Sequence, residues 1–550
     1  MRKVSPRLLA LMMAGAVTVT SITPVTGYQT ITVNAATDSQ EKEAAQGYQT
    51  NLTGFEYKEG DWKETKDGLY SNAVDKGDCF AFSKTTAKNF VYSTDVTFKR
   101  NQGAATLIFR FNNNLDNKEC YAVNIDGGSH KCKFWRWQEN SDYQLIDEKE
   151  VKATDDEKYT LKVVAYDSWI SYYVNDTLIA STGDYTLQKD DKGQSTVLTE
   201  GSLGLLNWNG EMTFQNTYYT ELNDQNTPEL KNISVSSSTG EVEKAAQFTS
   251  TEPIMIQYVK NNAETVDLNI EKKNKNADVQ VEYDGKTYND GKNIPVKVGK
   301  NYITVKSTVQ GENGQTATLT YRVNVHRRAA DKTYYNEAYR NQYHYSVKDG
   351  WGNDLNGLVK YKGTYHMFYQ FYDDTKWGPM HWAHATSKDL IHWEEQPIAL
   401  YPDANGAMFS GCIVADEKNT SGLFGDGNEG GLVALITADG NGQRIKVAYS
   451  TDEGKTWKKT NKIAADWSKD PLKNRDFRDP KVFRWENKWF MVIAGGPLRI
   501  YSSDNLTDWK CESTYADLHT ECPDLYPIET KDGVKWVLSR GGRSYKVGGF

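Results

Sequence analysis

The sequence predicts an all-β protein in which two β-sandwiches precede a β-propeller. Three observations carry this prediction. Short runs of alternating apolar and polar residues fill the chain from about residue 48, turn-rich clusters separate them, and a Ser…Asp…Trp pattern recurs in the last third. Period-two alternation is typical of strands that bury one face. The length of 550 residues corresponds to about three domains.

Composition narrows the possible functions. Hydrophobic residues make up 38% of the chain and aromatic residues 12%, which is enough for packed cores and excludes a mainly disordered protein. The net charge is −8, so we expect neither a nucleic-acid partner nor a basic membrane-binding patch. The 34 tyrosines and 15 tryptophans favour carbohydrate as a ligand, because the C–H faces of sugars stack on rings.

The first 36 residues predict a secretory signal peptide. Basic residues precede an uncharged, mostly apolar run from Leu8 to Thr20, and "VNAA" at 33–36 offers a cleavage site. This run is shorter than the roughly 20 residues that span a bilayer. We therefore expect a secreted protein, free or attached to the cell surface, without a membrane span beyond the signal.

Cysteine and histidine positions do not predict a metal or another cofactor. The six cysteines contain no Cys-x-x-Cys pair, and whether Cys120 and Cys132 form a disulfide stays open. His381 and His384 are three positions apart on a predicted strand, so they face opposite sides of it. We expect structural roles for both and for His392. The oligomeric state also stays open.

Residues 48–222 predict the first sandwich. Alternating runs are separated by turn clusters, and "WISYYVNDTLI" reads as a hairpin with an Asn-Asp turn. With "GSLGLLNWNGEMTFQN", the region resembles concanavalin/laminin-G-like carbohydrate-binding modules. For the stretch "FWRW" (134–137) the alternative is a pair of core rings with a surface arginine. The candidate sugar-binding residues are Arg110, Asp126, Trp135, Arg136 and Trp137.

Residues 228–327 predict a second sandwich. Clean alternation in runs such as "ETVDLNI" and "ATLTYRVNVHR" is accompanied by no cluster of catalytic residues. The region resembles a cadherin-like or bacterial immunoglobulin-like domain. We expect it to be a passive spacer.

From residue 336 the pattern changes to that of a propeller. The stretches "SKDLIHW", "STDEGKTW" and "SSDNLTDW" each place a Ser, an Asp and a turn before a Trp. Their spacing fits four-stranded blades of roughly 40–50 residues with loop insertions.

Three carboxylates near predicted blade starts indicate glycosidic chemistry. They are Asp354 in "WGNDLNG", Asp479 in "FRDPKVF" and Glu521 in "TECPDLYP". The innermost strands of a propeller converge on its axis, so these groups are expected to meet in one funnel-shaped pocket. A retaining glycosidase needs a nucleophile and an acid/base about 5–5.5 Å apart. A third carboxylate and the adjacent Arg478 would bind sugar hydroxyls. Taken singly, each motif is typical of an ordinary turn.

Residues 339–550 resemble glycoside hydrolase family 32, which contains invertases, inulinases and levanases. The motifs that carry the resemblance are "YRNQYHYS", "GWGNDLNG", "HMFYQF", "WGPMHWAHATSKDLIHWEEQPIALYPD", "MFSGCIV", "NTSGLFG", "FRDPKVF" and "ECPDLYPI". The resemblance implies a five-bladed propeller and a reaction that retains configuration through a covalent fructosyl-enzyme. It makes Asp354 the nucleophile, Glu521 the acid/base and Asp479 the transition-state stabiliser. It also implies a fructose pocket lined by Asn353, Gln370, Trp377, Phe409, Ser410 and Arg478.

Two features depart from the family pattern. The usual Trp-Met-Asn-Asp-Pro-Asn-Gly is here "WGNDLNG", with Gly352 and Leu355 in place of Met and Pro. The chain ends at "YKVGGF", which we expect to lie in the fourth blade, so the propeller is expected to be incomplete.

The sequence therefore predicts a secreted hydrolase of β-fructofuranosides: levan, inulin, fructo-oligosaccharides or sucrose. The attached sugar-binding module favours a polymer as the substrate, because tethering raises the effective concentration of the enzyme near a long chain. A fructosyltransferase on the same scaffold stays open as an alternative, as does a fructan-binding protein that is inactive because of truncation.

Overall fold

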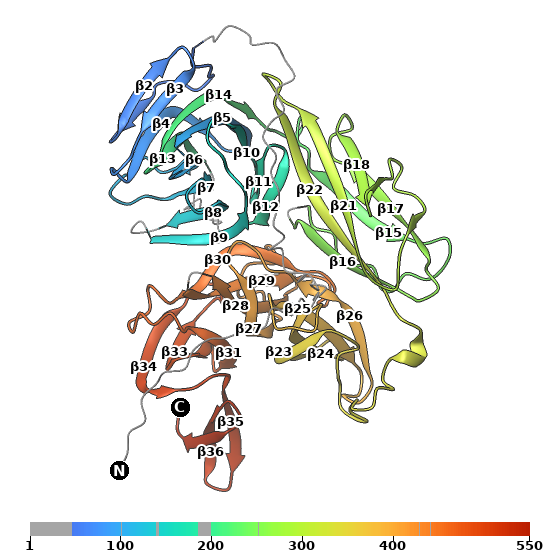
Figure 1. The fold of residues 1–550 in the computed structure, drawn as a ribbon. Coiled ribbons are helices and arrows are strands. Elements are labelled where there is room, and N and C mark those ends of the chain that lie inside the picture. The colour runs from blue at the N-terminus through green and yellow to red at the C-terminus, as the bar shows by residue number, and fades with distance from the viewer. Residues whose placement is uncertain are drawn as a thin grey trace, which may run out of the picture.

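A computed structural model describes residues 47–550 except 101, 139–141, 185–199, 251, 428 and 441. The predicted signal peptide lies outside the described residues. The described chain folds into β-sheets that form three units, as predicted (Figure 1). Among the described residues, no helix is both long enough and apolar enough to cross a bilayer.

The first unit is a sandwich of two seven-stranded sheets. One sheet has the order β1 (Glu56–Lys58), β4 (Asp78–Ala87), β13 (Gly201–Trp208), β6 (Ala104–Phe111), β7 (Cys120–Asp126), β8 (Lys131–Gln138) and β9 (Asp142–Glu150). The other has the order β12 (Thr177–Gly183), β11 (Trp169–Val174), β10 (Lys158–Tyr166), β5 (Phe90–Arg100), β14 (Glu211–Glu221), β3 (Gly68–Asn72) and β2 (Asp61–Thr65). Alternate residues of both sheets, such as Tyr92 and Phe109, form the core between them.

Two local predictions for this unit can be compared with the structure. The predicted hairpin is confirmed: β11 pairs with β12, and Asn175 and Asp176 have φ angles of 47° and 58°. Positive φ at both positions is what a type I′ turn requires. In "FWRW", Phe134 lies in the core, but Arg136 is only 6% exposed. The alternative interpretation of "FWRW", with a surface arginine, is therefore wrong, because this guanidinium is buried against another part of the chain.

The second unit is the smaller sandwich. Its three-stranded sheet contains β15 (Leu230–Ser236), β17 (Thr265–Lys272) and β20 (Ile294–Pro295). Its five-stranded sheet contains β16 (Ile254–Val259), β22 (Thr316–Arg327), β21 (Gly299–Gln310), β18 (Asp278–Tyr283) and β19 (Lys286–Thr287). The core of this unit continues into the first unit, where the ring of Trp169 meets Tyr321 edge-on at 4.6 Å.

The third unit follows a short 3-10 turn, η3 (Asp331–Thr333), and consists of four consecutive antiparallel sheets. The first has β23 (Trp351–Tyr361), β24 (Thr364–Tyr372), β25 (His381–Ser387) and β26 (Trp393–Leu400). The second has β27 (Ala407–Asp416), β28 (Gly431–Gly440), β29 (Gly442–Ser450) and β30 (Lys458–Asp466). The third has β31 (Arg478–Trp485), β32 (Lys488–Ala494), β33 (Pro497–Ser503) and β34 (Lys510–His519). The fourth has β35 (Pro523–Thr530), β36 (Gly533–Arg540) and β37 (Ser544–Gly548).

The sheets of the third unit are arranged as blades. Their first strands lie next to one another, with β23 against β27, β27 against β31 and β31 against β35. The number of five blades stays a prediction. Each Ser…Asp…Trp stretch lies between the third and fourth strand of a sheet. In each, the Trp indole N–H donates to the carbonyl three residues earlier, at 3.1, 3.2 and 2.8 Å for Trp393, Trp457 and Trp509.

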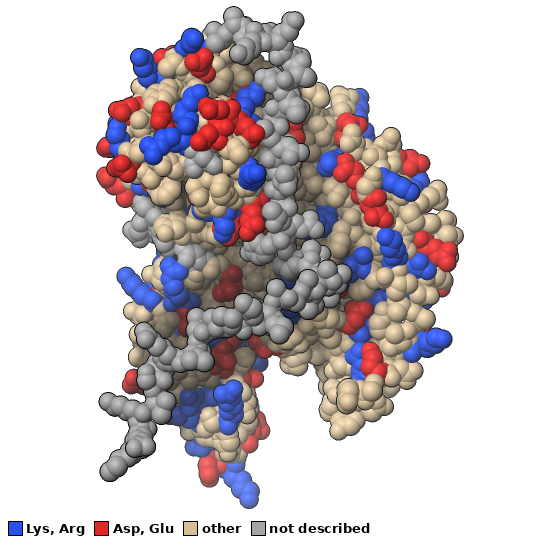
Figure 2. Space-filling model, viewed as in Figure 1, with Lys and Arg blue, Asp and Glu red and all other residues tan. Residues whose placement is uncertain are grey.

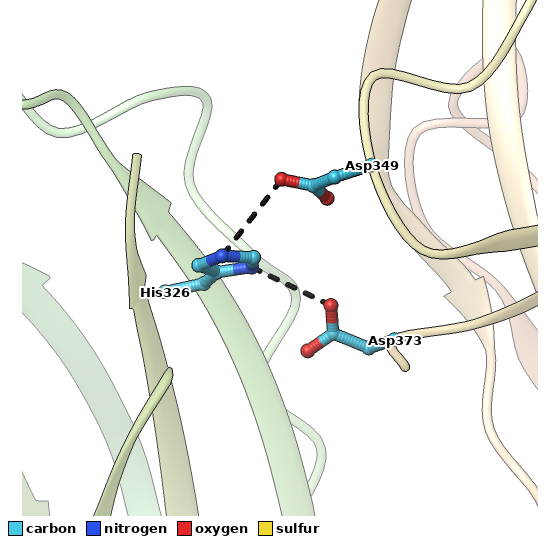
Figure 3. A group of neighbouring side chains, drawn as sticks. All are labelled: His326, Asp349 and Asp373. Carbon is cyan, nitrogen blue, oxygen red and sulfur yellow. Dashed lines mark ion pairs between the residues drawn. The ribbon is translucent and has the colours of Figure 1, made fainter. Parts of the chain in front are cut away.

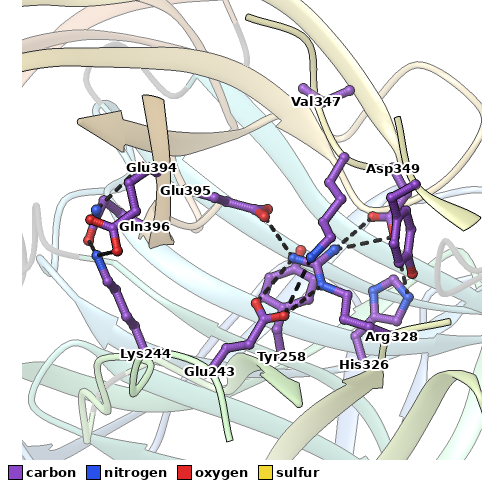
Figure 4. Close-up of polar contacts among 12 residues, drawn as sticks. Glu243, Lys244, Tyr258, His326, Arg328, Val347, Asp349, Glu394, Glu395 and Gln396 are labelled. Carbon is purple, nitrogen blue, oxygen red and sulfur yellow. Dashed lines mark hydrogen bonds and ion pairs between the residues drawn. The ribbon is translucent and has the colours of Figure 1, made fainter. Parts of the chain in front are cut away.

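Buried charges fix the second unit to the third (Figure 4). Arg328, at the end of the second unit, is 1% exposed and lies over the ring of Tyr258 at 3.8 Å. It binds Glu395 at 2.9 Å and Asp349 at 3.2 Å, both from the third unit. Ile256, Tyr258 and several β24 residues share a buried cluster. The predicted spacer is thus packed against both neighbours.

The first unit also contacts the third unit. Arg136 donates to Asp184 at 2.6 Å and to Asn405 at 3.3 Å, and the backbone N–H of Ala404 donates to Gly183 at 2.9 Å. Each unit therefore contacts the other two. On the face shown in Figure 2, Lys and Arg are interspersed with Asp and Glu over the first two units.

Candidate active site

The candidate site is formed by bulges in the first strand of each of the first three sheets of the third unit, at matching points of these strands. The pairing register shifts in β23 between Gly352 and Leu355, in β27 between Met408 and Gly411, and in β31 between Arg478 and Lys481. A bulge bends its strand and turns a side chain out of the alternating pattern. The residues inside these bulges are Asn353, Asp354, Phe409, Ser410, Asp479 and Pro480. The first and third sheets thus supply aspartates, and the second supplies Ser410.

Asp354 is held by a chain of polar side chains. Its Oδ2 accepts a hydrogen bond from Ser410 Oγ at 2.6 Å, and its Oδ1 accepts one from Asn353 Nδ2 at 3.2 Å. Gln370, buried on β24, accepts from Asn353 at 2.7 Å and donates to Ser410 Oγ at 2.9 Å. These contacts fix the Asp354 carboxylate in one orientation.

The side chain of Val347 explains sterically why position 352 is a glycine. A Cβ at Gly352 would lie 2.8 Å from Cγ1 of Val347, which is closer than real Cβ contacts come. A methionine here would require Val347 to move. The other departure, Leu355, is 57% exposed and leaves its side chain outside the core.

Asp479 lies beside Asp354 in an unusual backbone conformation. Its φ is 61°, in the left-handed region that a non-glycine residue rarely adopts. Its Oδ2 accepts the backbone N–H of Cys522 at 2.9 Å, and its own N–H donates to Thr437 Oγ1 at 3.1 Å. Burial, with the negative charges of Asp354 and Glu521, raises the pKa of Asp479 against the opposing effect of the Cys522 N–H and Arg478.

Glu521 reaches the same place from the loop before β35. Its Oε1 accepts a hydrogen bond from Arg478 Nη2 at 2.6 Å. The Arg478 guanidinium also lies 3.9 Å from Asp479. The side chain of Glu521 is 65% exposed, whereas Asp479 is buried. The three predicted carboxylates are therefore brought together, with one arginine between two of them.

Two aromatic rings, those of Trp377 and Phe409, pack together, and Phe409 lies in the β27 bulge next to Ser410. Trp377 is 49% exposed, and its ring meets that of Phe409 edge-on with centroids 5.4 Å apart. A ring with this exposure is available to a sugar face.

Three residues were not among the sequence candidates. Cys522 Sγ lies 3.8 Å from Asp354 and 3.7 Å from Asp479, between the two carboxylates. Thr437 and Gln443 bind the backbone N–H groups of Asp479 and Phe477. Cys522 could have been found within "ECP", because it follows Glu521 directly. Thr437 and Gln443 carry no signal in the sequence, since they approach from neighbouring strands.

Two groups among the described residues have the composition of metal ligands. In the first, Asp354, Asp479 and Cys522 offer ligand atoms that all lie within 4.8 Å of one another. In the second, His326 at the end of β22 lies between Asp349 and Asp373 (Figure 3), with ring nitrogens 3.8 and 3.4 Å from the two carboxylates. Asp349 is already paired with Arg328. The second group therefore forms part of the charged contact between the second and third units.

The candidate sugar-binding residues of the first unit are mostly internal. Arg110 is 0% exposed and donates to the carbonyls of Lys88 and Asp167 at 2.7 and 3.0 Å. Asp126 is buried and accepts from Ser129 Oγ at 2.6 Å. Arg136 is bound as described above. The half-buried ring of Trp135 packs on Tyr143 at 5.5 Å. Their role in sugar binding stays a prediction, and the structure gives each a partner within the chain.

Each of the three units matches the model of a known family. Residues 344–547 match the model "Glycosyl hydrolases family 32 N-terminal domain". Residues 47–219 match "3-keto-alpha-glucoside-1,2-lyase-like domain", and residues 230–328 match "Cadherin-like beta sandwich domain".

The individual proteins to which the chain is similar include two curated enzymes and one solved structure. A fructan beta-fructosidase from Streptococcus mutans is 65% identical over 91% of this chain and 35% of its own length. A levanase from Bacillus subtilis is 44% identical over 40% of this chain and 36% of its own length. The chain thus spans about a third of each of these relatives. The carbohydrate-binding module CBM66 from Bacillus subtilis, a solved structure, is 27% identical over 31% of this chain and 98% of that chain, with a TM-score of 0.27. By its motifs and its match, the propeller-like unit of this chain is similar to the N-terminal domain of glycosyl hydrolases family 32.

Proposed function

We propose that this protein is a retaining glycoside hydrolase that cleaves β-fructofuranosidic bonds of fructans, fructo-oligosaccharides or sucrose. One observation carries the proposal: Asp354 and Asp479, from different sheets, offer carboxylate oxygens within 4.8 Å of each other, and Arg478 links this pair to Glu521. The names of the relatives support the substrate class, since they include a fructan beta-fructosidase and levanases.

The proposed reaction has two steps. Asp354 attacks the anomeric carbon of the fructosyl unit while Glu521 donates a proton to the departing oxygen, which leaves a covalent fructosyl-enzyme. Glu521 then takes a proton from water, and the resulting attack on the anomeric carbon releases fructose and regenerates Asp354. Ser410 and Asn353 would aim the nucleophile. Asp479 and Arg478 would hold sugar hydroxyls as charge develops on the ring.

Each of the three units would have a different function. We assign residues 336–550 to catalysis, residues 48–222 to carbohydrate binding and residues 228–327 to the connection between them. A binding module that is packed against the catalytic unit would keep a fructan chain near the active site and favour a polymer over sucrose. The protein is proposed to act outside the cell, which agrees with the extracellular exo-inulinase among its relatives.

Fructose release tests the proposal. Asp354→Ala and Glu521→Gln should each reduce release from levan, inulin and sucrose by at least about 10³-fold, because each removes a group that takes part in bond making or breaking. Asp532→Asn, at an exposed turn outside the site, is the matched control and should retain full activity. Near-normal release by either site variant would overturn the assignment. Retention is checked separately by the anomeric form of the first product.

A further inference from the structure

A large cavity with a mixed polar and apolar lining lies between the first and second units, and none of its lining residues belongs to the candidate active site. Its volume is about 1090 Å³, near the upper end of the range of small-molecule pockets. The first unit supplies lining residues from β9, β10 and the hairpin β11–β12. The second unit supplies them from β16, β18, β21 and β22, and Figure 1 shows where these strands lie.

The wall from the second unit is a continuous stripe of hydrogen-bonding side chains. β21 and β22 alternate strictly, with residues such as Ile303, Val305 and Leu319 in the core. Their opposite face carries the cavity residues Tyr302, Thr304, Lys306, Thr308, Thr316, Thr318, Thr320 and Arg322. A threonine hydroxyl can donate and accept a hydrogen bond, as a sugar hydroxyl does. A face of this kind is usually open to water, but here the first unit covers it.

Some of these groups have partners within the wall and some do not. Thr308 and Thr318 share a hydrogen bond of 3.0 Å, and Lys306 binds Glu282 at 2.8 Å. In contrast, Tyr302 Oη is buried and has no hydrogen-bond partner within the described residues. A buried hydroxyl without a partner costs free energy, which a ligand that supplies one would recover.

The opposite wall complements this stripe. Asp147 lines the cavity from β9, and its Oδ1 accepts the N–H of Glu148 at 2.9 Å. Burial raises the pKa of Asp147 to about 6, and burial lowers that of its neighbour Lys149. Leu178 and Ala180 add an apolar surface, whereas the Tyr173 hydroxyl reaches the opposite wall and donates to the carbonyl of Thr318 at 2.7 Å.

The charges of the cavity nearly balance. Asp147, Asp176 and Glu282 oppose Lys149, Lys162, Lys306 and Arg322. Such a lining does not select a highly charged ligand. Interspersed donors and acceptors around an apolar patch suit a neutral ligand that carries many hydroxyls and exposes C–H faces.

We propose that this cavity is a second carbohydrate site, formed jointly by the first and second units, that binds a short segment of fructan chain. The inference rests on the proposed function for the identity of the sugar. It assigns the second unit a direct part in binding, beyond that of a spacer. A fructan chain held here would be retained by the protein while another segment occupies the active site.

Binding stoichiometry tests the inference. The full chain carrying Asp354→Ala, which prevents turnover, is titrated with short levan oligosaccharides in equilibrium dialysis. Adding Thr304→Trp, which fills the cavity, should reduce the number of oligosaccharides bound per chain by one. Adding Tyr302→Phe, which removes only the hydroxyl, should weaken that one binding event about five-fold. Tyr339→Phe, at a fully exposed position outside the cavity, is the control.

The outcomes separate the two proposals. An unchanged stoichiometry in a folded Thr304→Trp protein, together with unchanged affinity in Tyr302→Phe, overturns the second site, as would equally tight binding of glucan oligosaccharides. If Thr304→Trp does not fold, the Tyr302→Phe result alone decides. Fructose release is measured on the chain with Asp354 intact. If Thr304→Trp reduces the number of bound oligosaccharides by one, but the chain with Asp354 intact releases no fructose, the proposed hydrolase activity is contradicted and the cavity site is supported.

Discussion

Arg478 Nη2 donates a hydrogen bond of 2.6 Å to Glu521 Oε1, although 43 positions separate the two residues. The same guanidinium binds Gln443 and Asp476 at 3.2 Å each and lies 3.9 Å from Asp479. Arg478 therefore determines where the exposed Glu521 side chain points. A guanidinium presents five N–H donors in a fixed plane, whereas a lysine ammonium presents only three around a point charge.

We predict that Arg478→Lys lowers kcat/KM for fructan hydrolysis by at least tenfold while the protein stays folded. The positive charge remains, but the planar set of N–H donors that binds Glu521 and Gln443 in fixed directions is lost. Steady-state kinetics on sucrose and levan measure the effect. Arg484→Lys, an exposed arginine on the same strand β31, is the control and should behave like the unaltered chain. Full activity of Arg478→Lys would show that Arg478 does not position Glu521.

Ser410→Ala is expected to lower kcat about 10- to 100-fold. The hydroxyl donates to the Asp354 carboxylate at 2.6 Å, and a hydrogen bond to a charged group contributes roughly 1.5–3 kcal/mol. Loss of this contact frees the proposed nucleophile to rotate. Because alignment of the attack is affected, kcat should fall more than KM rises. Ser544→Ala, on the exposed strand β37, provides the comparison.

The contact between the second and third units should depend on Arg328 far more than on Lys244 (Figure 4). Arg328→Met would leave Glu243, Asp349 and Glu395 together without their buried cation, so we expect the free energy of unfolding to fall by about 3–5 kcal/mol. Lys244→Met breaks the solvent-exposed pair with Glu394 and should change it by less than about 1 kcal/mol. Thermal denaturation of both variants measures the difference, and equal effects would contradict this view of the interface.

Lys446 gives the protein a predictable pH dependence. Its side chain lies buried on β29 without a hydrogen-bond partner among the described residues, and burial lowers its pKa from 10.5 to about 8. Between these values the unfolded chain binds more protons than the folded one, so the contribution of Lys446 to the free energy of unfolding rises as pH increases from 8 to 10.5. Below pH 8 the full cost of the buried ammonium remains, on the order of 3 kcal/mol.

Lys446→Met should remove this cost. The variant is expected to be more stable than the unaltered protein at pH 7, and the difference should shrink toward zero near pH 10.5. Thermal denaturation at several pH values tests this. Lys455→Met, at an exposed turn, should show no such pH-dependent gain. If the stability difference between Lys446→Met and the unaltered protein stays constant from pH 7 to 10.5, the pKa of Lys446 is not lowered by burial.

The sequence by itself determined much of the local structure and the candidate residues of the site. Alternation defined the strands, the Asn175–Asp176 pair defined a hairpin turn, and the Ser…Asp…Trp stretches defined one repeated turn. Motifs around Asp354, Asp479 and Glu521 identified the carboxylates that now lie together. These features depend on residues close in the chain, whose spacing shows directly which way each side chain faces.

Only the tertiary structure decided how these parts meet. Register shifts in β23, β27 and β31 turn Asp354, Ser410 and Asp479 toward one another, and an alternating pattern cannot show which residue a bulge will contain. Arg136 looked like a surface residue because its partners Asp184 and Asn405 are 48 and 269 positions away. Likewise, the second unit looked like a plain spacer because its polar face becomes a cavity wall only when the first unit packs over it. Such contacts depend on the docking of whole units, which local spacing does not encode.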